Sequence, residues 1–149
     1  MLTNFWLPCF YATLASTGFC IIFNIRRPKR IFFAALGGGL AWAVYLLAAP
    51  VGSDLFQYFA ATIALSVYAE VMARIFKCPA TEFLLVALIP LVPGGGIYHT
   101  MEYCIQGDTS AFLETGLHTL GIAASLAVGI LLVSSAVRLY QTVTVMKRR

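Results

Sequence analysis

The chain has 149 residues, of which 60% are hydrophobic and only 11% are charged. Five apolar stretches of roughly 20 residues each would use about 100 of them, which leaves room for short loops and excludes a separate soluble domain. The formal net charge of +4 could indicate a nucleic-acid partner, but the basic residues flank the apolar stretches. We therefore expect an all-α integral membrane protein that forms one transmembrane domain over residues 1–149 and binds no nucleic acid.

Five membrane spans are predicted along the chain, and the fourth is broken by a Pro/Gly motif. In chain order they cover about residues 5–23, 31–51, 55–73, 83–102 and 112–139. Pro28 marks the turn before the second span, and Pro79 suits the start of the fourth. No basic residues precede the first span, so we expect it to be retained as a span and not removed as a signal peptide.

The charged residues sort by the side of the membrane on which five spans would place them. All Lys and Arg residues lie after the first or third span, or at and beyond the end of the fifth: Arg26, Arg27, Lys29, Arg30, Arg74, Lys77, Arg138, Lys147, Arg148 and Arg149. The second and fourth gaps contain Asp54, Glu102 and Asp108 and no basic residue. Because Lys and Arg accumulate in cytoplasmic loops, we expect an outside N-terminus and a cytoplasmic C-terminus.

The fourth span contains the sharpest local feature of the sequence. Its middle holds, in order, Pro90, Pro93, Gly94, Gly95, Gly96 and Tyr98. Proline lacks a backbone N–H and consecutive glycines destabilise a helix, so the second half of the span should begin near Gly95. A break of this kind is tolerated only where protein or water surrounds it. It favours a substrate site in which free N–H groups bind a carboxylate; the alternative is a simple kink that allows close packing.

Glu70, in the inner third of the third span, is the second candidate. An ionisable side chain at that depth is costly and is usually functional. Glu70 could carry a proton or contact a substrate ammonium group. The alternative is an ion pair with Arg74, four residues later, that reaches the cytoplasmic interface.

The remaining polar residues give weaker signals. His99 and Glu102 could line an outer vestibule, although a surface histidine is the commoner case, and His118 is expected to be a hydrogen-bonded packing residue. The four cysteines show no C-x-x-C spacing, and no catalytic motif is present. We expect no metal site, no cofactor and no enzymatic activity.

Taken together, these motifs resemble the threonine/serine exporter family, and in particular the short membrane subunit of its two-subunit form. The residues that carry the resemblance are Gly37, Gly38 and Gly39 in the second span, Glu70 and Arg74 in the third, and Pro90 to Gly95 with Tyr98 in the fourth. They cover about residues 31–101. The fifth span matches only as a generic apolar helix, and the first hardly matches at all.

The resemblance implies export of threonine, serine or a related small carboxylate-bearing metabolite across the bacterial inner (plasma) membrane. It implies a larger exporter-family membrane subunit as partner and leaves a higher oligomer open, with lipid and the small-molecule substrate as the other contacts. We expect substrate binding by Pro90, Pro93, Gly94, Gly95, Gly96 and Tyr98, proton or ion coupling by Glu70 and Arg74, and close approach of the second span to the break at Gly37, Gly38 and Gly39. The alternative is an accessory or scaffold subunit that stabilises a transporting partner.

Overall fold

The computed structural model describes residues 2–147 of the chain, and over that range it contains helices joined by short loops and no strands. In chain order the elements are α1 (Leu2–Ile22), α2 (Pro28–Ala48), α3 (Asp54–Phe76), α4 (Ala80–Leu88), the 3₁₀ turn η1 (Ile89–Leu91), α5 (Gly94–Gln106) and α6 (Thr109–Lys147). Four helices are long and apolar enough to cross a membrane, and the bent pair formed by α4–η1 and α5 makes five if it is counted as one span. The predicted all-α fold with a broken fourth span is confirmed.

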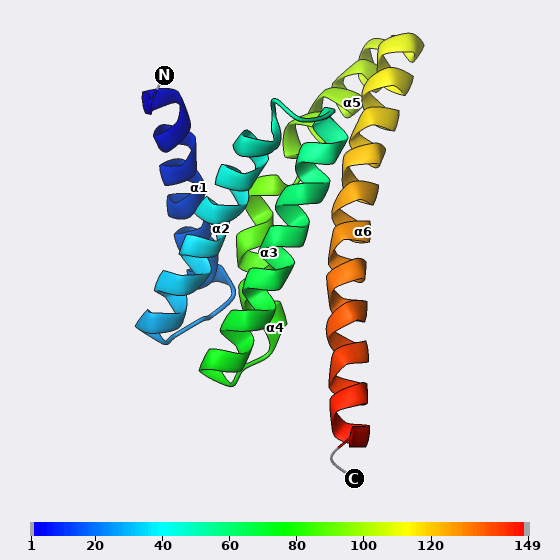
Figure 1. Cartoon of the computed structure of the whole chain (residues 1–149). Helices are drawn as coiled ribbons and strands as arrows, with labels where there is room; N and C mark the ends of the chain where they lie inside the picture. Colours follow the sequence, from blue (N-terminus) through cyan, green and yellow to red (C-terminus); the bar gives the residue numbers. More distant parts are fainter. Residues whose placement is uncertain (1, 148–149) are drawn as a thin grey trace.

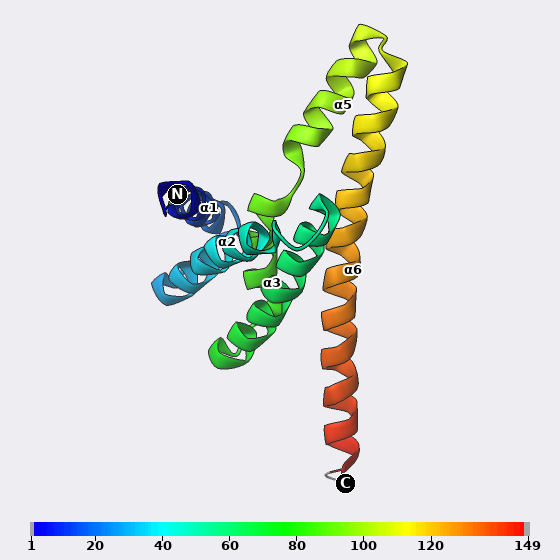
Figure 2. The same cartoon turned by 45° about the horizontal axis from the view of Figure 1, so that its top comes forward.

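The helices form two regions, a bundle and a hairpin (Figure 1). In the bundle, α2 packs against α1, α3 and α4. The hairpin consists of α5 and α6, which pack along each other, and α6 also packs along α3. Figure 2 shows α5 and the upper part of α6 standing away from the bundle, joined to α4 by a short irregular link.

The helix boundaries follow from local backbone chemistry. Pro28 is the first residue of α2, where a missing N–H costs nothing because that group has no partner within a helix. α3 ends at Phe76, and the residue after it, Lys77, is left-handed and donates its N–H to the Ala73 carbonyl. α6 has 39 residues, about 58 Å at 1.5 Å per residue. It is therefore much longer than the apolar stretch at 112–139, and it must tilt or project beyond the bilayer.

Small side chains dominate the buried core and let the helix backbones approach closely. One cluster joins α2, α3, α4, η1 and α6 through Ala41, Ala61, Leu65, Ala87, Leu91, Ile122 and Leu126. A second cluster, nearer the loops that carry the basic residues, contains Cys20, Ala34, Ala69, Phe83 and Val86. The first half of the broken span thus lies inside the bundle, with Leu91 fully buried just before the break.

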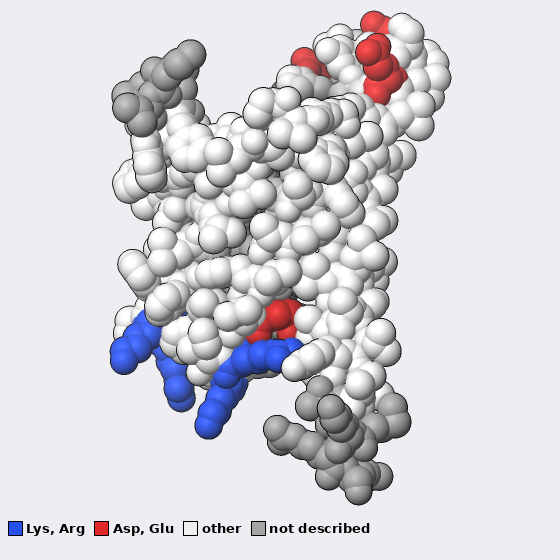
Figure 3. Space-filling model, in the orientation of Figure 1, with Lys and Arg blue, Asp and Glu red and all other residues white. Residues whose placement is uncertain are grey.

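Charged side chains divide between the two ends of the molecule. On the face shown in Figure 3, Lys and Arg side chains gather at one end, with acidic atoms beside them, and other acidic groups lie at the far end of the hairpin. Arg30 of α2 binds Glu82 of α4 at 3.1 Å within the basic end. The separation agrees with five alternating crossings; which end faces the cytoplasm stays a prediction.

Candidate functional site

The fourth span is broken where the prolines stand, and α5 leaves the axis of α4–η1 at an angle of 51°. Pro90 lies within the 3₁₀ turn, and Pro93 directly precedes α5 with φ −77° and ψ 59°. Pro93 has no N–H to donate to the Ile89 carbonyl, which instead accepts the Val92 N–H at 3.1 Å. The hydrogen-bond ladder therefore stops at η1 and restarts in α5.

The first turn of α5 presents unpaired backbone donors. The Gly94 N–H is used by the Val92 carbonyl at 2.7 Å, and Ile97 is the next residue whose N–H enters the helical pattern. Between them, the N–H groups of Gly95 and Gly96 have no acceptor within residues 2–147. Unpaired N–H groups and the positive end of the helix dipole meet here, as an anion site requires.

The three glycines of the motif lie in different surroundings. A Cβ on Gly94 or Gly95 would meet no atom of the described chain within 4 Å, whereas a Cβ on Gly96 would collide with the hydroxyl of Thr119 on α6. Thr119 is buried and donates its hydroxyl to the Thr115 carbonyl at 2.7 Å. Gly96 therefore serves helix packing, and Gly94 and Gly95 face open space in the described chain.

Tyr98, the last residue of the predicted substrate set, is 67% exposed on α5. Its ring packs edge to face against His99, with centroids 5.4 Å apart. His99 in turn lies 3.1 Å from Glu102, and both side chains are exposed. The break places Tyr98 one turn beyond Gly94, on the same short helix.

Glu70 is half-buried and forms no hydrogen bond or ion pair with any residue that the structure describes. Arg74 is exposed on the next turn of α3, and the alternative ion pair between the two is not formed. Leu65 shares a buried cluster with Leu91, next to the break. Glu70 lies five residues further along α3, about 7–8 Å toward the basic end, so the structure does not bring it to the α5 N-terminus.

The glycines of α2 pack against three different helices. A Cβ on Gly37 would lie 2.9 Å from the Tyr68 ring on α3 and 3.0 Å from Ala87 on α4. A Cβ on Gly38 would collide with Ser16 of α1. Gly39 meets Thr13 of α1 in the same way. Of the three glycines, Gly37 thus faces the half of the broken span that ends at Leu91.

A polar cluster at the start of α3 was not anticipated from the sequence. The Tyr45 hydroxyl of α2 donates to Asp54 Oδ1 at 2.7 Å, and His118 Nε2 of α6 lies 3.4 Å from Asp54 Oδ2. The Tyr45 ring also packs on Trp42 and Tyr58, with centroids 5.2 and 4.8 Å away. His118, which was expected to be a hydrogen-bonded packing residue, is instead 53% exposed and lies within ion-pair distance of Asp54, which the sequence showed only as an acidic residue between two spans.

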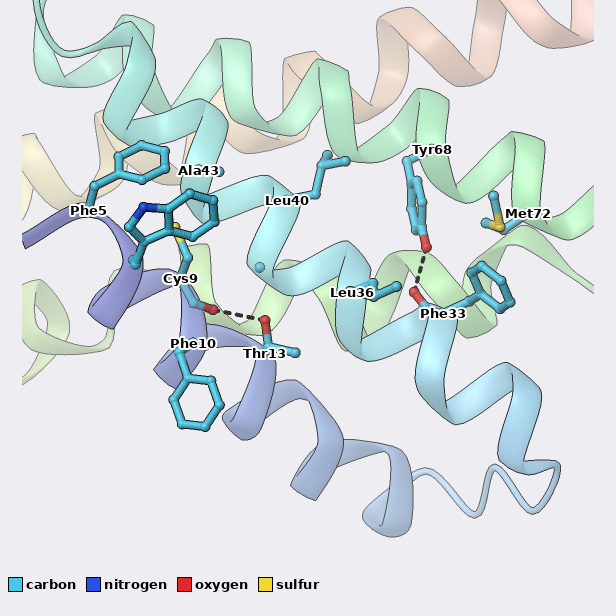
Figure 4. A pocket seen from close by; sticks show the side chains of 12 residues that line it. Phe5, Cys9, Phe10, Thr13, Phe33, Leu36, Leu40, Ala43, Tyr68 and Met72 are labelled. Atoms are coloured by element: carbon cyan, nitrogen blue, oxygen red, sulfur yellow. Dashed lines mark hydrogen bonds between the residues drawn. The ribbon is translucent and has the colours of Figure 1, made fainter. Parts of the chain in front are cut away.

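An open apolar groove of about 560 Å³ lies between α1, α2 and α3 (Figure 4). Its two hydroxyl groups are already bonded within the chain, Thr13 to the Cys9 carbonyl at 2.8 Å and Tyr68 to the Phe33 carbonyl at 2.6 Å. The groove offers hydrocarbon surface and does not include the break. Among the described residues, no group of three or more His, Cys, Asp or Glu side chains could hold a metal ion.

Comparison with known proteins supports the assignment that the motifs suggested. The family model of the threonine/serine exporter ThrE matches residues 8–136. Searches of curated proteins and of solved structures gave no match. The family match reaches well beyond the motif-bearing residues 31–101, into the first and last spans, which had shown little resemblance. The chain belongs to the threonine/serine exporter family.

Proposed function

We propose that this chain is a membrane subunit of a secondary exporter and that it binds the carboxylate of threonine, serine or a related small metabolite at the start of α5. The observation that carries the proposal is the pair of unpaired N–H groups on Gly95 and Gly96 at the break. The family supports the exporter role. Membership in a transporter family also favours a non-enzymatic protein.

A small carboxylate suits this helix end chemically. Two adjacent N–H groups can each donate to one carboxylate oxygen, and hydrogen bonds to a charged group contribute about 1.5–3 kcal/mol each. The absence of side chains at Gly94 and Gly95 lets a ligand reach the backbone. Tyr98, one turn further, is placed to contact the remainder of the substrate from the same helix.

A second subunit is needed to complete the site. No residue of α5 is buried by the rest of the described chain, and unpaired N–H groups facing lipid would be prohibitively costly. We therefore place the larger exporter-family membrane subunit over the open side of the break, where it would close the substrate off from lipid. The same exposure also fits the alternative role, an accessory subunit whose α5 only anchors a transporting partner.

Glu70 remains our candidate for proton or ion coupling, with Arg74 beside it. Its carboxylate is half-buried and has no partner in the described chain, and an ionisable group in that position is costly unless it is used. Because Glu70 lies toward the basic end, it would act on the inner access route and not on the carboxylate itself. The basic end is the inner side because we predict an outside N-terminus in the bacterial inner membrane.

Two substitutions at one position test the carboxylate site. Gly95→Pro removes the N–H from the first turn, where proline is compatible with a helix. Gly95→Ala keeps the N–H, and its Cβ has open space in the described chain. With the partner subunit reconstituted in proteoliposomes, we expect the proline variant to lose at least about tenfold in substrate affinity in counterflow, and the alanine variant to lose little.

The controls distinguish the two functions. An amide analogue of the substrate, which lacks the charge, should be carried poorly by both variants. If Gly95→Pro exports serine and threonine as well as the unchanged chain does, the N–H groups are not the binding site. If the partner alone transports at the full rate, the chain is an accessory subunit.

A further inference from the structure

Side chains from three helices meet where α3 begins. Asp54 accepts the Tyr45 hydroxyl of α2 on one carboxylate oxygen, at 2.7 Å, and its other oxygen lies 3.4 Å from His118 Nε2 of α6. The side chains of Asp54 and His118 are 38% and 53% exposed. Neither side chain is therefore buried by the rest of the described chain.

This cluster includes a residue on the turn of α6 that packs against the start of α5. His118 is followed by Thr119, whose side chain faces Gly96 of α5. Two residues later, a Cβ on Gly121 would lie 3.2 Å from the Leu55 side chain of α3. The same turn of α6 thus contacts the start of α3 and the start of α5, so that a shift of α6 against α3 carries the α5 N-terminus with it.

We infer that Asp54 and His118 form a proton-operated latch that holds the α5–α6 hairpin against α3. Histidine changes its charge between about pH 5 and pH 8. A protonated His118 attracts the Asp54 carboxylate as an ion pair, and a neutral one offers at most an ordinary hydrogen bond. The Tyr45 hydroxyl holds the carboxylate in place in both states, so the proton on His118 decides the strength of the contact.

The other ionisable groups described nearby do not form an ion pair with His118. Tyr58 of α3 packs on the Tyr45 ring, and Glu114 precedes His118 by one turn on α6. On α5, His99 and Glu102 bind each other at 3.1 Å. Among the described residues, the one ion-pair partner of His118 is Asp54.

Through the latch, the pH controls the position of the proposed substrate site at the start of α5. This link rests on the proposed function. Asp54 and His118 lie at the end of the molecule predicted to face outward. A proton from that side would favour the docked hairpin, and its loss would free the α5 N-terminus to move. Binding of the proton and docking of the hairpin would then be linked reciprocally.

Spin labels on α3 and α5 test the latch without measuring transport. Labels at Val67 and Ile105, which are 49% and 87% exposed, would report the α3–α5 distance in the full chain in lipid vesicles, with the native cysteines replaced. We expect the ratio of the docked to the undocked population to fall about two- to fivefold, the range of a partly exposed ion pair, when the pH is raised from about 5 to about 8. His118→Gln and Asp54→Asn should abolish this response, and His99→Gln should keep it.

A second variant covers the case in which Asp54→Asn fails to fold. His118→Lys stays charged over the whole range and should give the docked ratio at every pH. A distance that does not depend on pH in the unchanged chain, or a response that survives in His118→Gln, would overturn the latch. Because the readout is a distance, a chain that moves with pH but exports no carboxylate would overturn the proposed function and leave the latch standing.

Discussion

The bundle of α1 to α4 and the hairpin of α5 and α6 use glycine for different purposes. In the bundle, Gly37 and Gly38 each replace a side chain that would collide with Tyr68 or Ser16 of a neighbouring helix. In the hairpin, Gly94 and Gly95 replace side chains that would meet no atom of the described chain. Packing accounts fully for Gly37 and Gly38.

The difference indicates what to look for in an incomplete site. Where glycine is required by a neighbouring helix, no ligand is needed to explain it. Where glycine faces open space and leaves its N–H unpaired, we propose a substrate or another subunit as the missing neighbour. Gly96 marks the border between the two cases, because it belongs to the open motif but packs against Thr119.

The largest effect is expected within the bundle. Gly38→Ala would drive a methyl group into the fully buried Ser16, and overpacking of this kind costs about 1–3 kcal/mol. The matched control is Gly18→Ala on α1, where the described chain leaves space for the methyl group and the helix gains about 0.5–1 kcal/mol. Reversible unfolding in detergent should give opposite signs; equal effects would mean that α1 does not pack on α2 as described.

A smaller effect on stability is expected at Gly96, which belongs to the open motif but packs against Thr119. Gly96→Ala should cost about 1 kcal/mol, because Thr119 must turn away and lose its hydrogen bond to Thr115, whereas Gly95→Ala should not destabilise the chain. In a Thr119→Ala background most of this cost should disappear, which a double-mutant cycle would measure. A cost that is the same in both backgrounds would show that Gly96 does not face Thr119.

The third prediction compares an ion pair of the bundle with an ion pair of the hairpin. Glu82→Gln breaks the partly buried contact with Arg30 in the bundle and should cost about 0.5–1 kcal/mol at low salt, less at high salt. Glu102→Gln in the hairpin breaks the more exposed contact with His99 and should cost less. Unfolding at two salt concentrations checks the order, and a larger cost for Glu102→Gln would reverse the comparison.

The smallest effect concerns the turn of the hairpin. The Ala111 N–H and the Ser110 hydroxyl, 3.0 and 2.8 Å from Asp108 Oδ1, hold the pKa of this exposed carboxyl below its usual range. A lowered carboxyl pKa stabilises the folded state above the unfolded value of about 3.9 and loses that contribution as pH falls through the folded value. Hydrogen exchange in the first turn of α6 should therefore rise only in acid, and in Asp108→Ala it should be raised at neutral pH as well.

The sequence was sufficient for features that depend on neighbouring residues. Pro90 and Pro93 remove specific N–H groups whatever the surroundings, so the broken fourth span could be predicted and is confirmed. Helix ends were less accurate, because hydropathy marks the apolar stretch and not the hydrogen-bonded helix. For this reason α6 extends well past residue 139.

Features that depend on distant contacts could not be predicted in this way. Asp54 and His118 are brought together only by the packing of α3 on α6. The distinction between Gly95 and Gly96 depends on which face of α5 meets α6, and no local pattern reveals it. Spacing allowed a Glu70–Arg74 pair on one helix face, but the two side chains do not pair in the structure.

Backbone amide resonances of the glycines test the central claim most directly. In the reconstituted complex of this chain with its partner subunit, glycine-labelled protein would be titrated with serine or threonine and with the corresponding amides. We predict downfield shifts of the Gly95 and Gly96 amide protons with the carboxylates, little change with the amides, and no change at Gly18. Saturable binding of serine or threonine that leaves Gly95 and Gly96 unshifted would contradict a carboxylate site at the start of α5.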